Sequence, residues 1–178
     1  MGEYRVALGV PQGRGELVGP TSAWAPLFEA EAARIAAALR PFEARIEHCG
    51  STSVPGNPAK PIIDILIAIK APIDVAALAD ALAAIGYEHA NWAGVPGHEV
   101  FGKDEPRTHL LHVVPDEGEA WARMLAFRDA LRSDPALAAE YAALKQDLAQ
   151  RFPDNRSAYT DGKSGFVTRV LEAARGPE

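Results

Sequence analysis

Small hydroxyl residues beside a glycine, at residues 50–53, are the group in this chain best suited to binding a phosphate. The segment reads Gly-Ser-Thr-Ser. Glycine lets the backbone approach a ligand closely, and successive N–H groups in such a turn can form an anion site. A helical turn beginning at Ser51 would add unpaired N–H groups and the positive end of the helix dipole. We therefore predict a phosphate site at Gly50, Ser51, Thr52 and Ser53.

One carboxylate interrupts an apolar run shortly after this turn. Residues 62–69 are otherwise Ile, Leu and Ala, a pattern typical of a central strand covered on both faces. A buried charge without a partner is costly, so Asp64 needs a cation or a place at a cleft. We expect it to bind Mg²⁺, which often takes only one or two protein carboxylates, with Lys60 neutralising the charge that develops on the phosphate. The structural alternative is that Asp64 pairs with Lys60 or a histidine and stabilises the loop.

Histidines form the second group of chemically active side chains. His109 and His112 are three residues apart, so a regular strand would point them to opposite faces. We assign His112 to the face of Asp64, because it lies deeper in the apolar run at residues 108–114. With His48, which adjoins the Gly-Ser turn, they would form a His48–Asp64–His112 cluster for a transition metal or for general acid–base chemistry, as in a metal hydrolase. For each histidine alone, a hydrogen-bonded strand residue is the alternative.

The Gly-Ser turn differs from two common motifs. A nucleophile elbow has the pattern G-x-S-x-G, which GSTSVPG does not reproduce, so a serine hydrolase is not expected. A P-loop has the pattern GxxxxGK[ST], whereas Gly56 is followed here by Asn57 and Pro58.

Basic side chains in the C-terminal third of the chain could overhang the same cleft. Arg128 offers bidentate recognition of a phosphate, and Lys145 and Lys163 offer mobile point charges. Tyr159 lies four residues before Lys163, hence on the same face of a continuous helix, where it would support a base or a sugar. Taken alone, each basic residue is more often a solvated surface residue or an ion-pair partner.

Composition bounds the class of protein. With 178 residues, 48% apolar and 24% charged, we expect one domain over residues 1–178 with a core of its own. The net charge of −6 argues against bulk binding to nucleic acid or to an anionic membrane. Cys49 is the only cysteine and cannot form an internal disulfide, and we expect neither a signal peptide nor a membrane span. These features favour a cytoplasmic protein.

The order of expected elements predicts an α+β fold. After a cap at Thr21 or Ser22, a helix runs to about residue 40, and further helices follow at residues 74–85, 117–132, from 135 onward and within 157–175. Strands are expected at residues 44–49, 62–69, 87–90, 99–102 and 108–114. Helices gather at both ends and strands in the middle, which favours a mixed sheet flanked by helices, with a C-terminal three-helix segment.

A family resemblance rests on several of these segments. The string HCGSTSVPGNPAKPIIDILI resembles the diagnostic segment of the GrpB family, HxGSTSVPGLxAKPxxDIxV. The strings THLLHV, FRD, YAALK and YTDGK are similar to later motifs of that family, and the match covers about residues 21–175. Asn57 replaces the usual leucine, a change expected to alter only loop packing. The resemblance implies a nucleotidyltransferase-like fold of the polymerase-beta type, and it favours Arg128 and Lys163 as site residues.

The resemblance also implies a function. In that superfamily a Gly-Ser turn holds nucleotide phosphates, and two carboxylates two residues apart on the next strand bind Mg²⁺. Leu66 occupies the second position here, so full two-metal catalysis is not expected. We predict a protein that binds a phosphorylated ligand, foremost a nucleotide, with metal-dependent nucleotidyl or phosphoryl transfer as its reaction class.

The alternative is a non-catalytic ligand-binding or folding-accessory domain that lost turnover with the second acid. GrpB-like domains also occur fused to dephospho-CoA kinase, which implies a functional link to that enzyme.

Overall fold

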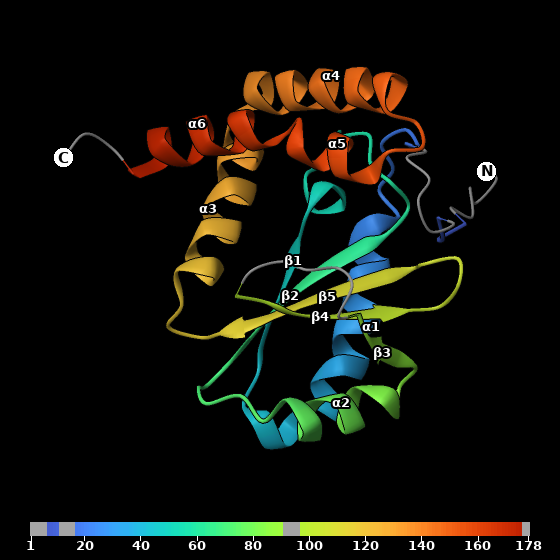
Figure 1. Cartoon of the computed structure of the whole chain (residues 1–178), viewed down its shortest axis with the longest axis vertical. Helices are drawn as coiled ribbons and strands as arrows, with labels where there is room; N and C mark the ends of the chain where they lie inside the picture. Colours follow the sequence, from blue (N-terminus) through green and yellow to red (C-terminus); the bar gives the residue numbers. More distant parts are fainter. Residues whose placement is uncertain (1–6, 11–16, 91–96, 176–178) are drawn as a thin grey trace.

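A mixed sheet forms the centre of the molecule in the computed structural model, which describes residues 7–10, 17–90 and 97–175 (Figure 1). Within these residues the sheet has five strands in the order β1-β2-β5-β4-β3. The two central strands, β2 and β5, are parallel, and the other neighbours are antiparallel. The α+β class with a mixed sheet is therefore confirmed. The strands are β1 (Arg45–Cys49), β2 (Ile63–Ile69), β3 (Tyr87–His89), β4 (Glu99–Lys103) and β5 (His109–Pro115).

Strand β2 is covered on both faces, as its composition predicts. Every residue from Ile65 to Ile69 is at most 3% exposed, and Ile63 is fully buried. Only Asp64 departs from this pattern, with 28% of its side chain exposed. A strand that is buried except for one carboxylate places that carboxylate at an opening in the core.

Helices cover the two faces of the sheet. The first face packs against α1 (Trp24–Ala38) and α2 (Val75–Ala83), with Ile65 and Ile67 in one apolar cluster with residues of both helices. The second face packs against α3 (Glu119–Ser133), where Leu66 and Cys49 meet Trp121 and neighbouring apolar side chains. Within the described residues, no helix has the length and apolar character needed to cross a membrane.

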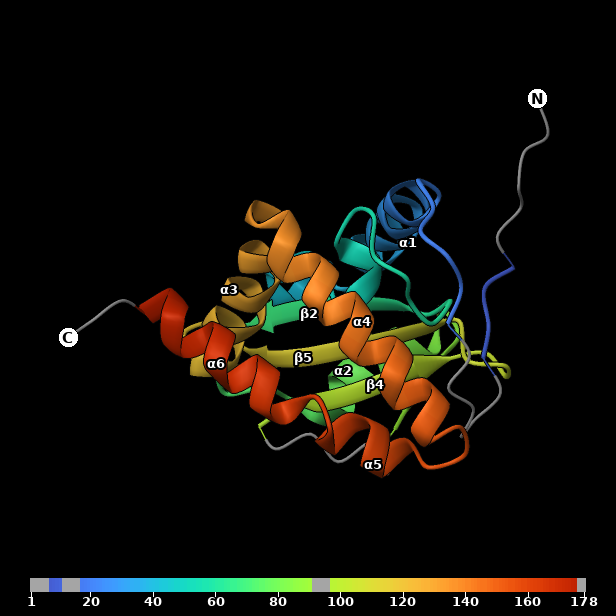
Figure 2. The ribbon, with the colours of Figure 1, turned by 90° about the horizontal axis from the view of Figure 1, so that it is seen from above.

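The remaining helices lie across one end of the sheet and against α3 (Figures 1 and 2). They are α4 (Pro135–Arg151), α5 (Arg156–Asp161) and α6 (Ser164–Arg175). The prediction of one helix within residues 157–175 was wrong, because the helix breaks at Gly162. The described C-terminal part of the chain therefore holds four helices, α3 to α6, where three were predicted. Glycine is a poor helix former, and the Ser164 hydroxyl donates to the carbonyl of Asp161 (2.7 Å) across the break.

Local signals set the other boundaries. Asp74 caps α2, where its carboxylate accepts a hydrogen bond from the Ala77 N–H (3.0 Å), as predicted. Asp134 caps α4 in the same way, immediately before Pro135 at the first helical position. After α1 the chain makes a short 3₁₀ turn, η1 (Arg40–Phe42), around the proline that ends the helix.

Candidate functional site

The Gly-Ser turn and the carboxylate of Asp64 are in direct contact. Gly50 has φ +66°, and a Cβ at this position would lie 2.3 Å from Oδ2 of Asp64. The pairing of β1 with β2 causes this approach, because it places Cys49 opposite Asp64 and the turn follows at once. Only glycine satisfies both the backbone conformation and the space. The turn continues as a 3₁₀ helix, η2 (Ser51–Ser53).

Two of the three hydroxyls in this turn are buried and bonded to groups of the turn or of β1. The Ser53 hydroxyl donates to the carbonyl of Gly50 (2.6 Å), and Thr52 Oγ1 lies 2.9 Å from Nε2 of His48. Both side chains are buried. Ser51 lines the cleft described next, and its side chain is hydrogen-bonded to Tyr141. The structure therefore brings Gly50 and Ser51 to the cleft, but not the hydroxyls of Thr52 and Ser53.

A cavity of about 330 Å³ lies where the turn, the start of β2 and the C-terminal helices meet. Its polar residues on one side are Gly50, Ser51, Asp64, Tyr141 and Lys163. Arg123 and Arg128 of α3 also line it, and its apolar residues are Val54, Met124, Phe127, Leu131, Val167 and Leu171. A largely apolar cleft with a few convergent polar groups is the usual form of a small-molecule site.

His112 accompanies Asp64 on this face of the sheet. Its Nε2 lies 3.9 Å from Oδ1 of Asp64, and its Nδ1 lies 3.4 Å from Nδ1 of His98. Burial lowers the pKa of His98. His109 lies on the opposite face, where it approaches the Tyr87 ring, and burial lowers its pKa as well. The alternation of side chains along β5 thus separates the two histidines in the predicted way.

His48 lies away from Asp64. In the register of the two strands it pairs with Ile65, so it faces α1, where its ring stacks on Phe28 with centroids 4.6 Å apart. Burial, with Arg132 and Arg128 adding to it, lowers the pKa of His48 to about 4, so the ring is neutral. The His48–Asp64–His112 cluster is therefore not formed. No group of three or more His, Cys, Asp or Glu residues in the described part of the chain is placed to hold a metal ion.

Three lysines lie over two tyrosine rings near the cleft, Lys60 and Lys163 over Tyr159 and Lys145 over Tyr141. The Nζ atoms of Lys60 and Lys163 lie 4.5 and 4.7 Å from the centroid of the Tyr159 ring. Lys145 is 1% exposed, and its Nζ donates to the carbonyl of Pro58. Burial, helped by the positive charge of Lys163, lowers the pKa of Lys145 to about 8. The break after α5 leaves Lys163 over Tyr159, although the two residues are not in one continuous helix.

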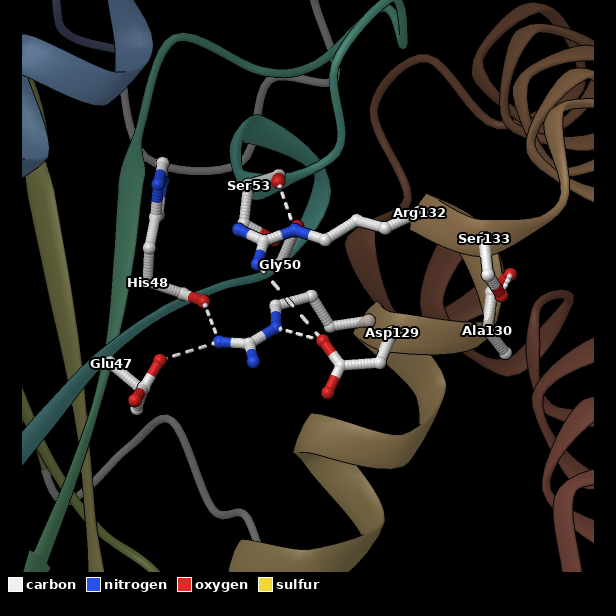
Figure 3. Close-up of polar contacts among 9 residues, drawn as sticks. Glu47, His48, Gly50, Ser53, Asp129, Ala130, Arg132 and Ser133 are labelled. Atoms are coloured by element: carbon white, nitrogen blue, oxygen red, sulfur yellow. Dashed lines mark hydrogen bonds and ion pairs between the residues drawn. The ribbon is translucent and has the colours of Figure 1, made fainter.

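Arg128 links α3 to strand β1 by hydrogen bonds. Its Nη1 donates to Oε2 of Glu47 (2.7 Å) and to the carbonyl of His48 (3.0 Å), and its Nε donates to Oδ1 of Asp129 (2.7 Å) (Figure 3). Arg132 similarly donates to the carbonyl of Ser53 (2.9 Å). Arg128 lines the cleft, but these bonds occupy the fork that was expected to recognise a phosphate.

Two features of the site are not evident from the sequence alone. Tyr141 is connected to Lys145, which was expected to overhang the cleft, only by the spacing of four in the YAALK string, which puts both on one helical face. The apolar wall was visible in the spacing of Lys163, Val167 and Leu171, which also recur every four residues. For the apolar residues such spacing is equally typical of core packing, because nothing local shows that a helix face borders a cavity.

The comparisons with known proteins decide the family. The family model described as GrpB protein matches residues 15–173. The chain belongs to the GrpB family. A crystal structure of the conserved GrpB protein from Enterococcus faecalis is similar, with a TM-score of 0.80 and 35% identity over 89% of this chain and 96% of that one. The sheet with its C-terminal helices is thus the GrpB fold.

Two relatives extend the GrpB comparison. The glutamate-rich protein GrpB of Alkalihalophilus pseudofirmus is 35% identical over 92% of this chain and 98% of its own length. A dephospho-CoA kinase of Mycolicibacterium paratuberculosis is 29% identical over 89% of this chain, which spans only 45% of that protein. The second match is a similarity to part of a dephospho-CoA kinase, the enzyme to which the motif resemblance implied a link.

Proposed function

We propose that the cleft binds the phosphate of a small phosphorylated molecule, with nucleotides as the leading candidates. The observation that supports this most is the pair of ammonium groups on the Tyr159 ring: Lys163 lines the cavity, and Lys60 lies over the same ring. Two ammonium groups in one place attract a phosphate more strongly than either charge would alone. The contacts with the aromatic ring fix the positions of both ammonium groups in advance.

Other groups at this end suit the same ligand. Ser51 offers a hydroxyl, and Gly50 offers a backbone that a ligand can approach, both lining the cavity. Lys145 lies over the ring of Tyr141, which lines the cavity, and adds positive charge with almost no exposure to solvent. A phosphate accepts hydrogen bonds from ammonium and hydroxyl groups and is attracted by the lysine charges in a partly desolvated site.

Asp64 fits a single cation that also contacts the ligand. It is the carboxylate that lines the cavity among the described residues, and it lies against the Gly-Ser turn. Leu66, at the second acidic position of the superfamily pattern, is fully buried. Such a donor set suits Mg²⁺ completed by waters and ligand phosphates, but not a two-metal centre.

If the protein turns over its ligand, we propose nucleotidyl or phosphoryl transfer in a nucleotidyltransferase-like fold. Bound Mg²⁺ would supply neutralisation of phosphate charge. Lys60 and Lys163 would hold the phosphate and neutralise charge that develops on its oxygens, and His112 would move a proton at the Asp64 side of the cleft. The non-catalytic alternative is favoured by one observation, the complete burial of Leu66.

Isothermal titration calorimetry tests the binding proposal. Inorganic phosphate, pyrophosphate, ATP and dephospho-CoA are titrated into the protein with and without Mg²⁺. Lys163→Gln should weaken the binding of the tightest ligand by about tenfold or more. Lys70→Gln, which removes an exposed lysine directly after β2 and outside the cavity lining, should leave that affinity unchanged. Binding by none of the four probes, or equal losses in both variants, would refute the proposal.

A second variant tests the metal. Asp64→Asn keeps the size of the side chain and removes the charge that would hold Mg²⁺. Any enhancement of binding by Mg²⁺ should disappear while binding without the metal persists. An undiminished Mg²⁺ effect in the variant would show that another group holds the cation.

A further inference from the structure

The apolar wall of the cleft is built by one face of each of two helices. Met124, Phe127 and Leu131 of α3 have the spacing of one helical stripe, and all three line the cavity. Val167 and Leu171 of the neighbouring helix α6 line the same cavity. The helices lie side by side, and Arg175 at the end of α6 donates to Glu119 at the start of α3 (2.9 Å). The wall is thus a continuous surface.

Charge and apolar surface are ordered along α6. Lys163 directly precedes this helix, and Val167 and Leu171 follow on the same face one and two turns later. At a rise of about 1.5 Å per residue, they lie about 6 and 12 Å from Lys163 along the axis. A ligand whose phosphate meets Lys163 therefore has its next atoms beside apolar side chains.

Polar groups along the wall are few in the described part of the cleft. Arg128 is bonded to two carboxylates and a carbonyl, and the half-exposed Arg123 lies 3.5 Å from Glu119. Sugar hydroxyls placed against Met124, Phe127 and Val167 would lose water without gaining hydrogen bonds, which is unfavourable. An aromatic ring would instead gain contact with the Met124 sulfur and the Phe127 ring.

We propose that this cleft is selective for aromatic phosphoesters, and that it holds the aromatic ring by apolar contact with Met124, Phe127 and Val167. This inference rests on the proposed phosphate site and adds the chemical class of the remainder of the ligand. A nucleotide belongs to this class only where its base, and not its ribose, lies against these apolar side chains; the base would then be held by its faces, with no hydrogen bonds to read its edges. Recognition of this kind discriminates weakly between the bases and strongly between aromatic esters and simple sugar phosphates.

Three small probes measured by calorimetry on the full chain separate the two halves of the site. Inorganic phosphate reports on the phosphate end alone, ribose 5-phosphate adds a polar body, and phenyl phosphate adds an aromatic one. Phenyl phosphate should bind about tenfold or more tightly than either of the other two, because burial of its ring adds apolar contact. Met124→Gln and Val167→Thr are near-isosteric polar substitutions in the wall. Each should lower the affinity for phenyl phosphate at least threefold, while the affinity for inorganic phosphate stays the same.

Ala122→Gln is the matched control, because Ala122 lies on the exposed side of α3 and its substitution should change none of the three affinities. If inorganic phosphate binds but phenyl phosphate binds no better, or ribose 5-phosphate binds equally well, the aromatic subsite is overturned and the phosphate site stands. If the wall variants leave the gain intact, the subsite is likewise overturned. If none of the three probes binds, the phosphate site itself fails and the subsite with it.

Discussion

Gly50 and Asp64 are packed so closely that a side chain on Gly50 would overlap the carboxylate of Asp64. A Cβ on Gly50 would fall 2.3 Å from Oδ2 and 2.9 Å from the Cβ of Asp64. The carboxylate therefore cannot move toward the turn, and its remaining direction is the cavity that both residues line. The position of the acid in this cleft is fixed by the glycine beside it.

The first prediction follows from this contact. Gly50→Ala should lower the free energy of unfolding by about 2–4 kcal/mol, because it combines an unfavourable backbone conformation with displacement of the carboxylate. Gly56→Ala is the control: Gly56 has φ +78° but open space around it, so it should cost only about 1 kcal/mol. Urea denaturation measures both. Equal losses would mean that the contact with Asp64 is unimportant for stability.

The buried lysine gives a second prediction. Because the pKa of Lys145 is lowered to about 8, its charge at pH 7 is held at a cost to the folded state. Lys145→Met should raise the free energy of unfolding at pH 7 by about 1–3 kcal/mol, while it weakens phosphate binding. In the unchanged protein, phosphate affinity should fall as pH rises through 8 and the ammonium loses its proton.

Lys103→Met provides the contrast, since Lys103 is also buried but is paired with Glu31 (2.8 Å). Removing this partner should destabilise the protein by about 3–5 kcal/mol. If both substitutions destabilised the fold equally, Lys145 would be an ordinary structural residue.

Asn57 supplies a third prediction. Its side chain is 3% exposed, and neither Nδ2 nor Oδ1 has a hydrogen-bond partner among the described residues. Asn57→Leu, the residue of the family pattern, should raise the free energy of unfolding by about 1–3 kcal/mol. The same change at Asn155, which caps α5 through the Ala158 N–H (3.0 Å), should cost about 1 kcal/mol. Thermal and urea unfolding of the two variants should therefore shift in opposite directions, and a destabilised Asn57→Leu protein would contradict the prediction.

The neutral ring of His48 predicts a dependence of stability on pH. Unfolding returns its pKa from about 4 to about 6.5, so the unfolded chain binds the proton more readily between these values. The free energy of unfolding should fall as pH drops from 6.5 to 4, by roughly 3 kcal/mol from this group. His48→Gln should flatten that part of the curve, leaving the smaller slope expected from the lowered pKa values of His98, His109 and Glu31. Parallel curves would exclude His48 as the source.

Strand periodicity made part of this arrangement predictable from sequence. The apolar run with one acid placed Asp64 at a break in a covered strand, and a separation of three residues placed His109 and His112 on opposite faces. Both inferences rest on the period of two along a strand, which tertiary packing does not change. The sheet and helix boundaries followed equally from Gly, Pro and capping residues.

The predictions that were wrong concern features that depend on contacts between distant segments of the chain. The face of His48 is set by the pairing of Cys49 with Asp64, a register that neither strand encodes alone. Arg128 donates to Glu47, which lies 81 positions away in the sequence. Local sequence therefore does not predict that Arg128 links α3 to the sheet. The need for glycine at position 162 also depends on tertiary packing, because a Cβ there would lie 2.4 Å from a methyl group of Leu148.

The cavity walls come from two stretches of the chain, residues 50–64 and 123–171, that belong to different layers of the molecule. A molecule seated between them would join the sheet to the helices non-covalently, so its binding energy would add to the stability of their docking. The amides of α6 would then exchange with solvent more slowly when the site is filled than when it is empty. Occupancy of the cleft and attachment of the last helix are in this way two measures of a single equilibrium.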